Sequence, residues 1–103
     1  MAKVTRVTKA MAQARLADVL QDKAFWCCDG RVLQSLAELE VALREMSDEA
    51  FCYHSNAEKA DFSNWVRDVI GDEKLSRDLQ KSATRFEAAK SVAARIAWLK
   101  SKQ

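Results

Sequence analysis

The sequence predicts a small all-α domain of four to five helices with a short β-hairpin near residues 25–33. Its 103 residues suffice for one hydrophobic core, so residues 1–103 are expected to form a single domain. The chain contains no proline and only two glycines, whereas a β-sandwich needs turn residues every few positions. Ser/Thr-x-x-Glu sequences, which cap helix N-termini, stand ahead of apolar residues at helical spacing. Together these observations favour helices over sheets.

The first third of the chain is predicted to hold one helix and the hairpin. Residues 1–9 mix basic and β-branched side chains and are expected to be a disordered basic tail. Good helix formers then predict a helix over residues 10–23. Residues 25–28 are strand-like, Asp29-Gly30 is a strong turn signal, and residues 31–33 form the returning strand.

Capping signals divide the middle of the chain into amphipathic helices. Ser35-Leu36-Ala37-Glu38 and Ser55-Asn56-Ala57-Glu58 are capping boxes, and Ser47 is expected to start a short helix between them. Gly71 is predicted to end the following helix in a left-handed conformation, and Asp72 to cap the next one. The apolar stripes comprise Leu36, Leu39, Leu43 and Met46, and then Phe62, Trp65, Val66, Val69 and Ile70.

Two further helices complete the predicted fold. Leu75 and Leu79 mark a short helix that ends near Ser82. Thr84-Arg85-Phe86-Glu87 is a third capping box and begins the last helix. The residues of that helix expected to face inward are Phe86, Ala89, Val92, Ala93, Ile96 and Leu99, with Lys90, Arg95 and Lys100 facing outward.

The formal charge of +2 hides an acidic middle between basic ends. Residues 1–24 hold five basic and two acidic side chains, residues 25–71 four and nine, and residues 72–103 eight and four. These counts give the three segments net charges of +3, −5 and +4, respectively. No apolar run approaches the roughly 18 to 20 residues that span a bilayer, and no signal peptide is recognisable. We therefore expect a cytoplasmic protein without a membrane partner.

The lone histidine lies in a polar segment with two interpretations. His54, Asn56, Lys59 and Asp61 form either a recognition patch or a hydrogen-bond network that fixes the turn between two helices, and the network is favoured. A helix that continued past His54 would align it with Glu58 and Asp61 as an oriented general base. The break expected at residues 55–57 spoils that alignment. No other catalytic motif is present, so we expect no enzyme.

The cysteines raise the question of a metal or redox site. Cys27, Cys28, Cys52 and His54 carry the donor atoms of a tetrahedral zinc site. Adjacent cysteines rarely chelate one ion, however, and Cys52 and His54 would point to different faces of a helix. A disulfide from Cys52 to either of the others is compatible with the sequence, but reduced, half-buried thiols are favoured. We expect no metal and no other cofactor.

A nucleic-acid interface is the first alternative function. Basic residues at both ends of the chain could neutralise phosphates, although they are dilute beside a typical basic arm. Trp98 lies beside the apolar stripe of the last helix, so it either covers the edge of the core or stacks on a base. The residues that this alternative would use are Lys3, Arg6, Lys9, Arg15, Arg95, Trp98 and Lys100.

Residues 25–72 contain the motif F-x-x-H-x-N-x-x-K-x-D-F-x-x-W, from Phe51 to Trp65. On this motif the segment resembles a family of small prokaryotic proteins, mostly archaeal and bacterial, known only as a domain of unknown function. Position 60 is alanine where the family pattern tends to have asparagine. Further matching positions are Phe25, Asp29, Gly30, Ser35, Leu36, Leu39, Leu43, Met46, Ser47, Val69, Gly71 and Asp72.

The resemblance implies a compact helical domain and carries no established activity. Some members of the family look like appendages of larger enzymes, which favours a docking role. The sequence therefore predicts a non-enzymatic interaction or adaptor domain with an unidentified protein partner. A homodimer is a further expectation, because a chain of this size can leave one apolar helix face uncovered. The second alternative is a Cys/His metal or redox protein.

Overall fold

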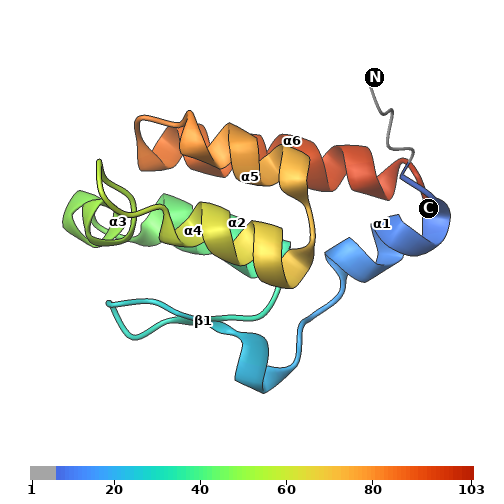
Figure 1. The fold of residues 1–103 in the computed structure, drawn as a ribbon, viewed down its shortest axis with the longest axis horizontal. Coiled ribbons are helices and arrows are strands. Elements are labelled where there is room, and N and C mark those ends of the chain that lie inside the picture. Colours follow the sequence, from blue (N-terminus) through green and yellow to red (C-terminus); the bar gives the residue numbers. More distant parts are fainter. Residues whose placement is uncertain (1–6) are drawn as a thin grey trace.

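The computed structural model describes residues 7–103 and confirms an all-α fold with one short hairpin (Figure 1). The described residues contain six α-helices, against the four to five expected. The α-helices are α1 (Lys9–Leu16), α2 (Leu36–Glu45), α3 (Asp48–His54), α4 (Asp61–Trp65), α5 (Glu73–Gln80) and α6 (Arg85–Lys100). The remaining elements are the 3-10 turn η1 (Gln21–Lys23), the strands β1 (Phe25–Trp26) and β2 (Val32–Leu33), and the π-helical segment η2 (Val66–Ile70).

The helices form two layers, and the hairpin lies on the outer side of one of them (Figure 1). Helices α5 and α6 make up one layer, and α2 and α4 make up the other. Helix α2 packs along α6, while α1 packs against α6 beside the C-terminus. The strands pair antiparallel, with Phe25 opposite Leu33 and Trp26 opposite Val32. The core takes buried apolar side chains from every α-helix and both strands.

Two of the three predicted capping boxes cap helices. Ser35 Oγ accepts the N–H of Glu38 at 3.2 Å, and the Glu38 carboxylate accepts the N–H of Gln34 at 2.7 Å. The glutamate thus reaches one residue further back than the standard box requires. Thr84 and Glu87 repeat the same arrangement at α6. The predicted caps at Ser47 and Asp72 are also confirmed (α3 and α5).

The predicted capping box at Ser55 is wrong. Ser55 follows the last residue of α3 and forms an isolated bridge with Ala60, and α4 begins only at Asp61. The side chain of Asn56 explains the difference: its Oδ1 accepts the N–H groups of Glu58 and Lys59 at 2.9 and 3.1 Å. An asparagine that hydrogen-bonds its own following backbone stabilises a turn in competition with a helix.

The predicted helix over residues 10–23 is also wrong at its C-terminal end. Helix α1 ends at Leu16, and the chain then runs extended until η1. Val19 N–H donates to Gln34 O at 2.7 Å, and the Gln34 amide donates back to Val19 O at 3.1 Å. This pairing beside β2 replaces the helical hydrogen bonds, so tertiary contacts override the local helix propensity.

The predicted disordered tail falls partly within the described residues. Residues 1–6 lie outside them. Val7 packs against the core, Thr8 accepts the N–H of Met11 at 3.1 Å as the cap of α1, and Lys9 is the first residue of that helix.

Helix α4 widens into η2 before it ends at Gly71. The N–H of Gly71 donates to Val66 O at 2.8 Å, five residues back, which is the hydrogen bond of a π-helix. Gly71 then adopts a left-handed φ of 85°, as predicted, and Gly30 has a φ of 96° in the hairpin turn. Asp72 follows directly and is fully buried.

Two orientations predicted for α6 are corrected. Phe86, expected in the core, is 56% exposed. Its neighbour Arg85 lies inward instead, where its guanidinium donates to Asp48 at 2.8 Å and to Arg44 O at 2.7 Å. Arg95, expected to face solvent, binds Asp72 through two hydrogen bonds of 2.7 and 3.1 Å. A buried carboxylate requires such a partner, and the apolar spacing of α6 does not reveal it.

Replacing Asp72 by alanine should lower the free energy of unfolding by about 3 kcal/mol, measured by urea denaturation. The variant removes the cap of α5 and leaves the Arg95 guanidinium, whose side chain is 12% exposed, without its carboxylate. Asp68→Ala is the matched control, because its ion pair with Arg67 is exposed and should change stability by less than about 1 kcal/mol. Equal effects of the two variants would contradict this prediction.

Candidate functional site

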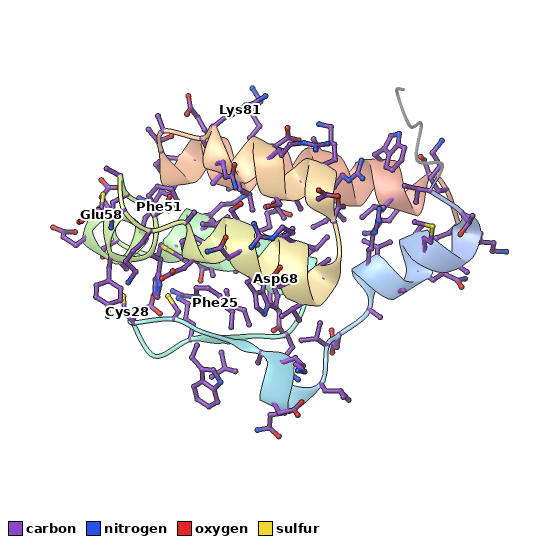
Figure 2. The ribbon with its side chains drawn as sticks, viewed as in Figure 1. Phe25, Cys28, Phe51, Glu58, Asp68 and Lys81 are labelled. Atoms are coloured by element: carbon purple, nitrogen blue, oxygen red, sulfur yellow. The ribbon has the colours of Figure 1, made fainter. Side chains whose placement is uncertain are left out.

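The lone histidine is buried where the hairpin meets the helices. His54 is the last residue of α3 and is 5% exposed. The ring of Phe25 from β1 contacts it edge-on at a centroid distance of 5.0 Å, and Phe62 from α4 does so at 5.3 Å. Figure 2 shows Phe25 between the hairpin and the helical layer, and Cys28 at the hairpin end near α3. An aromatic pocket therefore surrounds the imidazole.

Both ring nitrogens of His54 are hydrogen-bonded. Nε2 accepts the backbone N–H of Cys28 at 3.0 Å, and Nδ1 lies 2.9 Å from Asp61 Oδ2. Because Nε2 is an acceptor, the neutral ring carries its proton on Nδ1 and donates it to the carboxylate. Lys59 Nζ lies 3.3 Å from the same carboxylate oxygen. The result is a continuous chain of contacts from the hairpin through α3 to the first residue of α4.

The four residues singled out at this site therefore have two kinds of role. The Asp61 carboxylate contacts both His54 and Lys59, and Lys59 Nζ also lies 4.0 Å from the centre of the Tyr53 ring. Asn56 joins them only through the backbone, because its amide donates to Cys52 O at 2.8 Å and its oxygen holds the following turn. These contacts form a hydrogen-bond and ion-pair network across the turn between α3 and α4.

Three of the four candidate metal ligands come together beside this network. The Sγ atoms of Cys27 and Cys28 and a ring nitrogen of His54 all lie within 4.8 Å of one another. Cys52 is exposed on α3 and is not part of this group. Burial raises the pKa of the Cys27 thiol to about 11. Residue spacing could not reveal this cluster, because it forms where the hairpin folds over the end of α3.

The residues of the nucleic-acid alternative are only partly brought together. Arg15, Arg95 and Trp98 line one pocket of about 320 Å³ between α1, α5 and α6. Arg95 is committed to Asp72, and its guanidinium lies 4.3 Å from the centre of the Trp98 ring. Lys102 Nζ lies 4.9 Å from the same centre, and Trp98 itself is 38% exposed. Lys9 and Lys100 are exposed outside this pocket, and Lys3 and Arg6 lie outside the described residues.

A second surface, which the sequence analysis did not identify, lies between the hairpin and α2. Val32, Leu33, Ala37 and Val41 are among the residues that line a groove of about 450 Å³. Trp26 pairs with Val32 in the hairpin and is 66% exposed. We call the outward-facing Trp26, Val32, Ala37 and Val41 the hairpin–α2 surface. The sequence alternation of Phe25 and Trp26 could have indicated that one of these side chains faces solvent. It does not show which one is covered, or that Val41 lies near the hairpin.

No helix among residues 7–103 has the length and apolar character needed to cross a membrane. No family model, curated protein or solved structure matches the chain. The resemblance noted over residues 25–72 therefore stays a prediction from sequence.

Replacing Asp61 by alanine should lower the free energy of unfolding by about 1–3 kcal/mol, because the buried Nδ1–H of His54 would lose its acceptor. Glu58→Ala, in the exposed part of the same turn, is the control and should change stability by less than about 0.5 kcal/mol. The measurement is chemical denaturation followed by circular dichroism. An Asp61 variant of unchanged stability would favour the recognition patch over the network.

The cysteines should differ in their rate of alkylation in the metal-free, reduced protein. Cys28 and Cys52 are exposed, whereas Cys27 is buried. Burial raises the pKa of Cys27 to about 11, so near neutral pH this residue remains a protonated thiol, which iodoacetamide modifies slowly. Mass spectrometry of the native protein after brief iodoacetamide treatment should show two modified cysteines before the third. Modification of Cys27 as fast as Cys52 would contradict the prediction, and denatured protein supplies the control in which all three react.

Proposed function

We propose that the chain is a non-enzymatic interaction domain that binds a partner protein on the hairpin–α2 surface. The observation that carries this proposal is an exposed apolar patch beside a groove. Trp26, Val32 and Val41 are 66%, 38% and 50% exposed. An exposed tryptophan flanked by aliphatic side chains is typical of protein-binding surfaces, where large aromatic residues contribute most of the binding free energy.

The fold itself does not need these side chains. Within the same two strands, Phe25 and Leu33 point inward and are 8% and 4% exposed. On α2, the inward stripe is completed by fully buried leucines, and Val41 lies outside that stripe. The core is therefore filled by the alternate residues, and the outward ones remain available to a partner.

The charges around the groove indicate the chemistry of the partner. Arg31 at its edge is neutralised by ion pairs of 3.0 Å with both Asp29 and Glu45. Glu38, which also lines the groove, has no ion-pair partner among the described residues. The wider segment 25–71 carries a net charge of −5. We infer a partner segment that presents apolar side chains flanked by lysine or arginine.

The environment of His54 supports a non-enzymatic role. A general base needs a ring nitrogen that can reach a substrate proton. Here one nitrogen accepts a backbone N–H and the other is bound to a carboxylate, inside a pocket that leaves the residue 5% exposed. The three free cysteines support a reducing, cytoplasmic location.

The nucleic-acid alternative receives less support. Arg95 and Trp98, the residues chosen for phosphate contact and base stacking, are engaged with Asp72 and with each other. A base that stacks on Trp98 would compete with the Arg95 and Lys102 cations for the ring.

The test compares affinity capture by the wild-type protein, a Trp26→Ser/Val41→Asp variant and a Phe86→Ser control. Phe86 is 56% exposed but lies on α6, in the other helical layer. We expect the wild type and the Phe86→Ser control to retain a partner protein. The double variant should bind this partner at least tenfold more weakly. All three proteins should melt at similar temperatures. A synthetic peptide of the captured partner, apolar with basic flanks, should then bind with the same ranking.

Two outcomes would contradict the proposal. Capture that is equal for all three proteins would exclude this surface as the docking site. Light scattering that shows a wild-type dimer, lost in the double variant, would assign the surface to self-association instead.

A further inference from the structure

We propose that Cys27, Cys28 and His54 bind one thiophilic divalent cation of the zinc class where the hairpin meets α3. This inference is independent of the docking function, because the ligands belong to a different side-chain cluster.

The ligand atoms are already close to the spacing that zinc requires. Zinc bonds of about 2.3 Å to sulfur and 2.0–2.1 Å to imidazole nitrogen place tetrahedral ligand atoms roughly 3.5–3.8 Å apart. The two Sγ atoms and the ring nitrogen lie within 4.8 Å of one another. Side-chain movements of about 1 Å would close the site. Cys28 is exposed in the hairpin and so is the ligand with the most room to move.

His54 is oriented as zinc-binding histidines usually are. A metal-bound imidazole commonly donates its other N–H to a carboxylate, which fixes the tautomer and raises the basicity of the ligating nitrogen. Asp61 holds Nδ1 at 2.9 Å, which leaves the lone pair of Nε2 on the side of the cysteines. That lone pair now accepts the Cys28 N–H, so metal binding would replace this hydrogen bond with a bond from Nε2 to the cation.

The charges of the proposed complex balance. Each thiol releases one proton when it binds, so a divalent cation with two thiolates and a neutral imidazole has no net charge. The neighbouring Asp61 carboxylate has its own counter-ion in Lys59 at 3.3 Å. A neutral complex avoids the cost of burying an unpaired charge beside Phe25 and Phe62.

The donor set selects the class of metal. Two sulfurs and one imidazole suit zinc and its substitutes cobalt and cadmium, whereas magnesium and calcium prefer oxygen ligands. The described residues supply three ligands, and a water molecule would complete the tetrahedral coordination.

The test is a titration of the reduced full chain with cobalt(II) under anaerobic conditions. We expect thiolate-to-cobalt charge-transfer absorption that saturates at one equivalent and is abolished by zinc. Zinc, but not magnesium, should raise the melting temperature. The ¹⁵N resonance of His54 Nε2 should shift on zinc binding.

Three variants localise the site. Cys28→Ser should abolish the charge-transfer band, whereas Cys52→Ser, the matched control with an exposed cysteine outside the cluster, should retain it. Asp61→Asn keeps a hydrogen-bond acceptor but removes the charge, and should weaken binding by about 10- to 100-fold. Circular dichroism establishes that each variant is folded before it is titrated.

Several results would overturn the proposal. These are a wild-type protein without the band, a Cys28→Ser variant that keeps it, a Cys52→Ser variant that loses it, or zinc binding that leaves the His54 resonances unmoved.

Discussion

The hydrogen bonds of His54 attach the hairpin to the helices, and the arrangement of the possible binding surfaces depends on them. A hairpin with two residues in each strand is not stable alone in water. His54 holds its far end through the Cys28 N–H. At the near end, the indole of the buried Trp65 donates to Lys23 O at 2.8 Å. Phe25 fills the space between these two anchors, stacked on Phe62 at 4.9 Å.

This attachment links two features that would otherwise be unrelated. Trp26 presents its side chain outward, to the hairpin–α2 surface, whereas the next residue, Cys27, is buried beside His54. A cation bound by Cys27 and Cys28 would hold the same stretch of backbone from which Trp26 projects. The metal would then lower the conformational entropy lost when a partner binds, without touching that partner.

Features that depend on neighbouring residues could be predicted from the sequence, and features that depend on distant ones could not. A helix cap involves only residues close in sequence, because its side chain accepts the N–H three residues ahead. The caps that could therefore be recognised are Ser35, Ser47, Asp72 and Thr84. At the candidate site, the motif from Phe51 to Trp65 drew attention to His54 and Asp61, which do contact each other. The third partner of this network, the Cys28 N–H, could not be predicted from the sequence, because it lies 26 residues away from His54.

The incorrect expectations have the same cause. Helix propensity continued past Leu16, but Val19 bonds to Gln34, and no local pattern records that pairing. Arg95 was expected to face outward, away from the apolar stripe of α6, yet it binds the buried Asp72, which caps α5. The capping box predicted at Ser55 is wrong for a local reason instead. The side chain of Asn56 accepts the N–H groups of the following residues and holds them in a turn rather than in the first turn of a helix.

The π-helical segment η2 has a consequence for the geometry of the whole domain. A π-turn contains one residue more than an α-helical turn, and each residue advances an α-helix by about 100°. The extra residue between Val66 and Ile70 therefore sets the rotational phase at which the chain leaves for α5. At this phase Asp72 points into the interior and meets Arg95. A chain shortened by one residue here could regain a regular helix, but it would turn that carboxylate away from its partner.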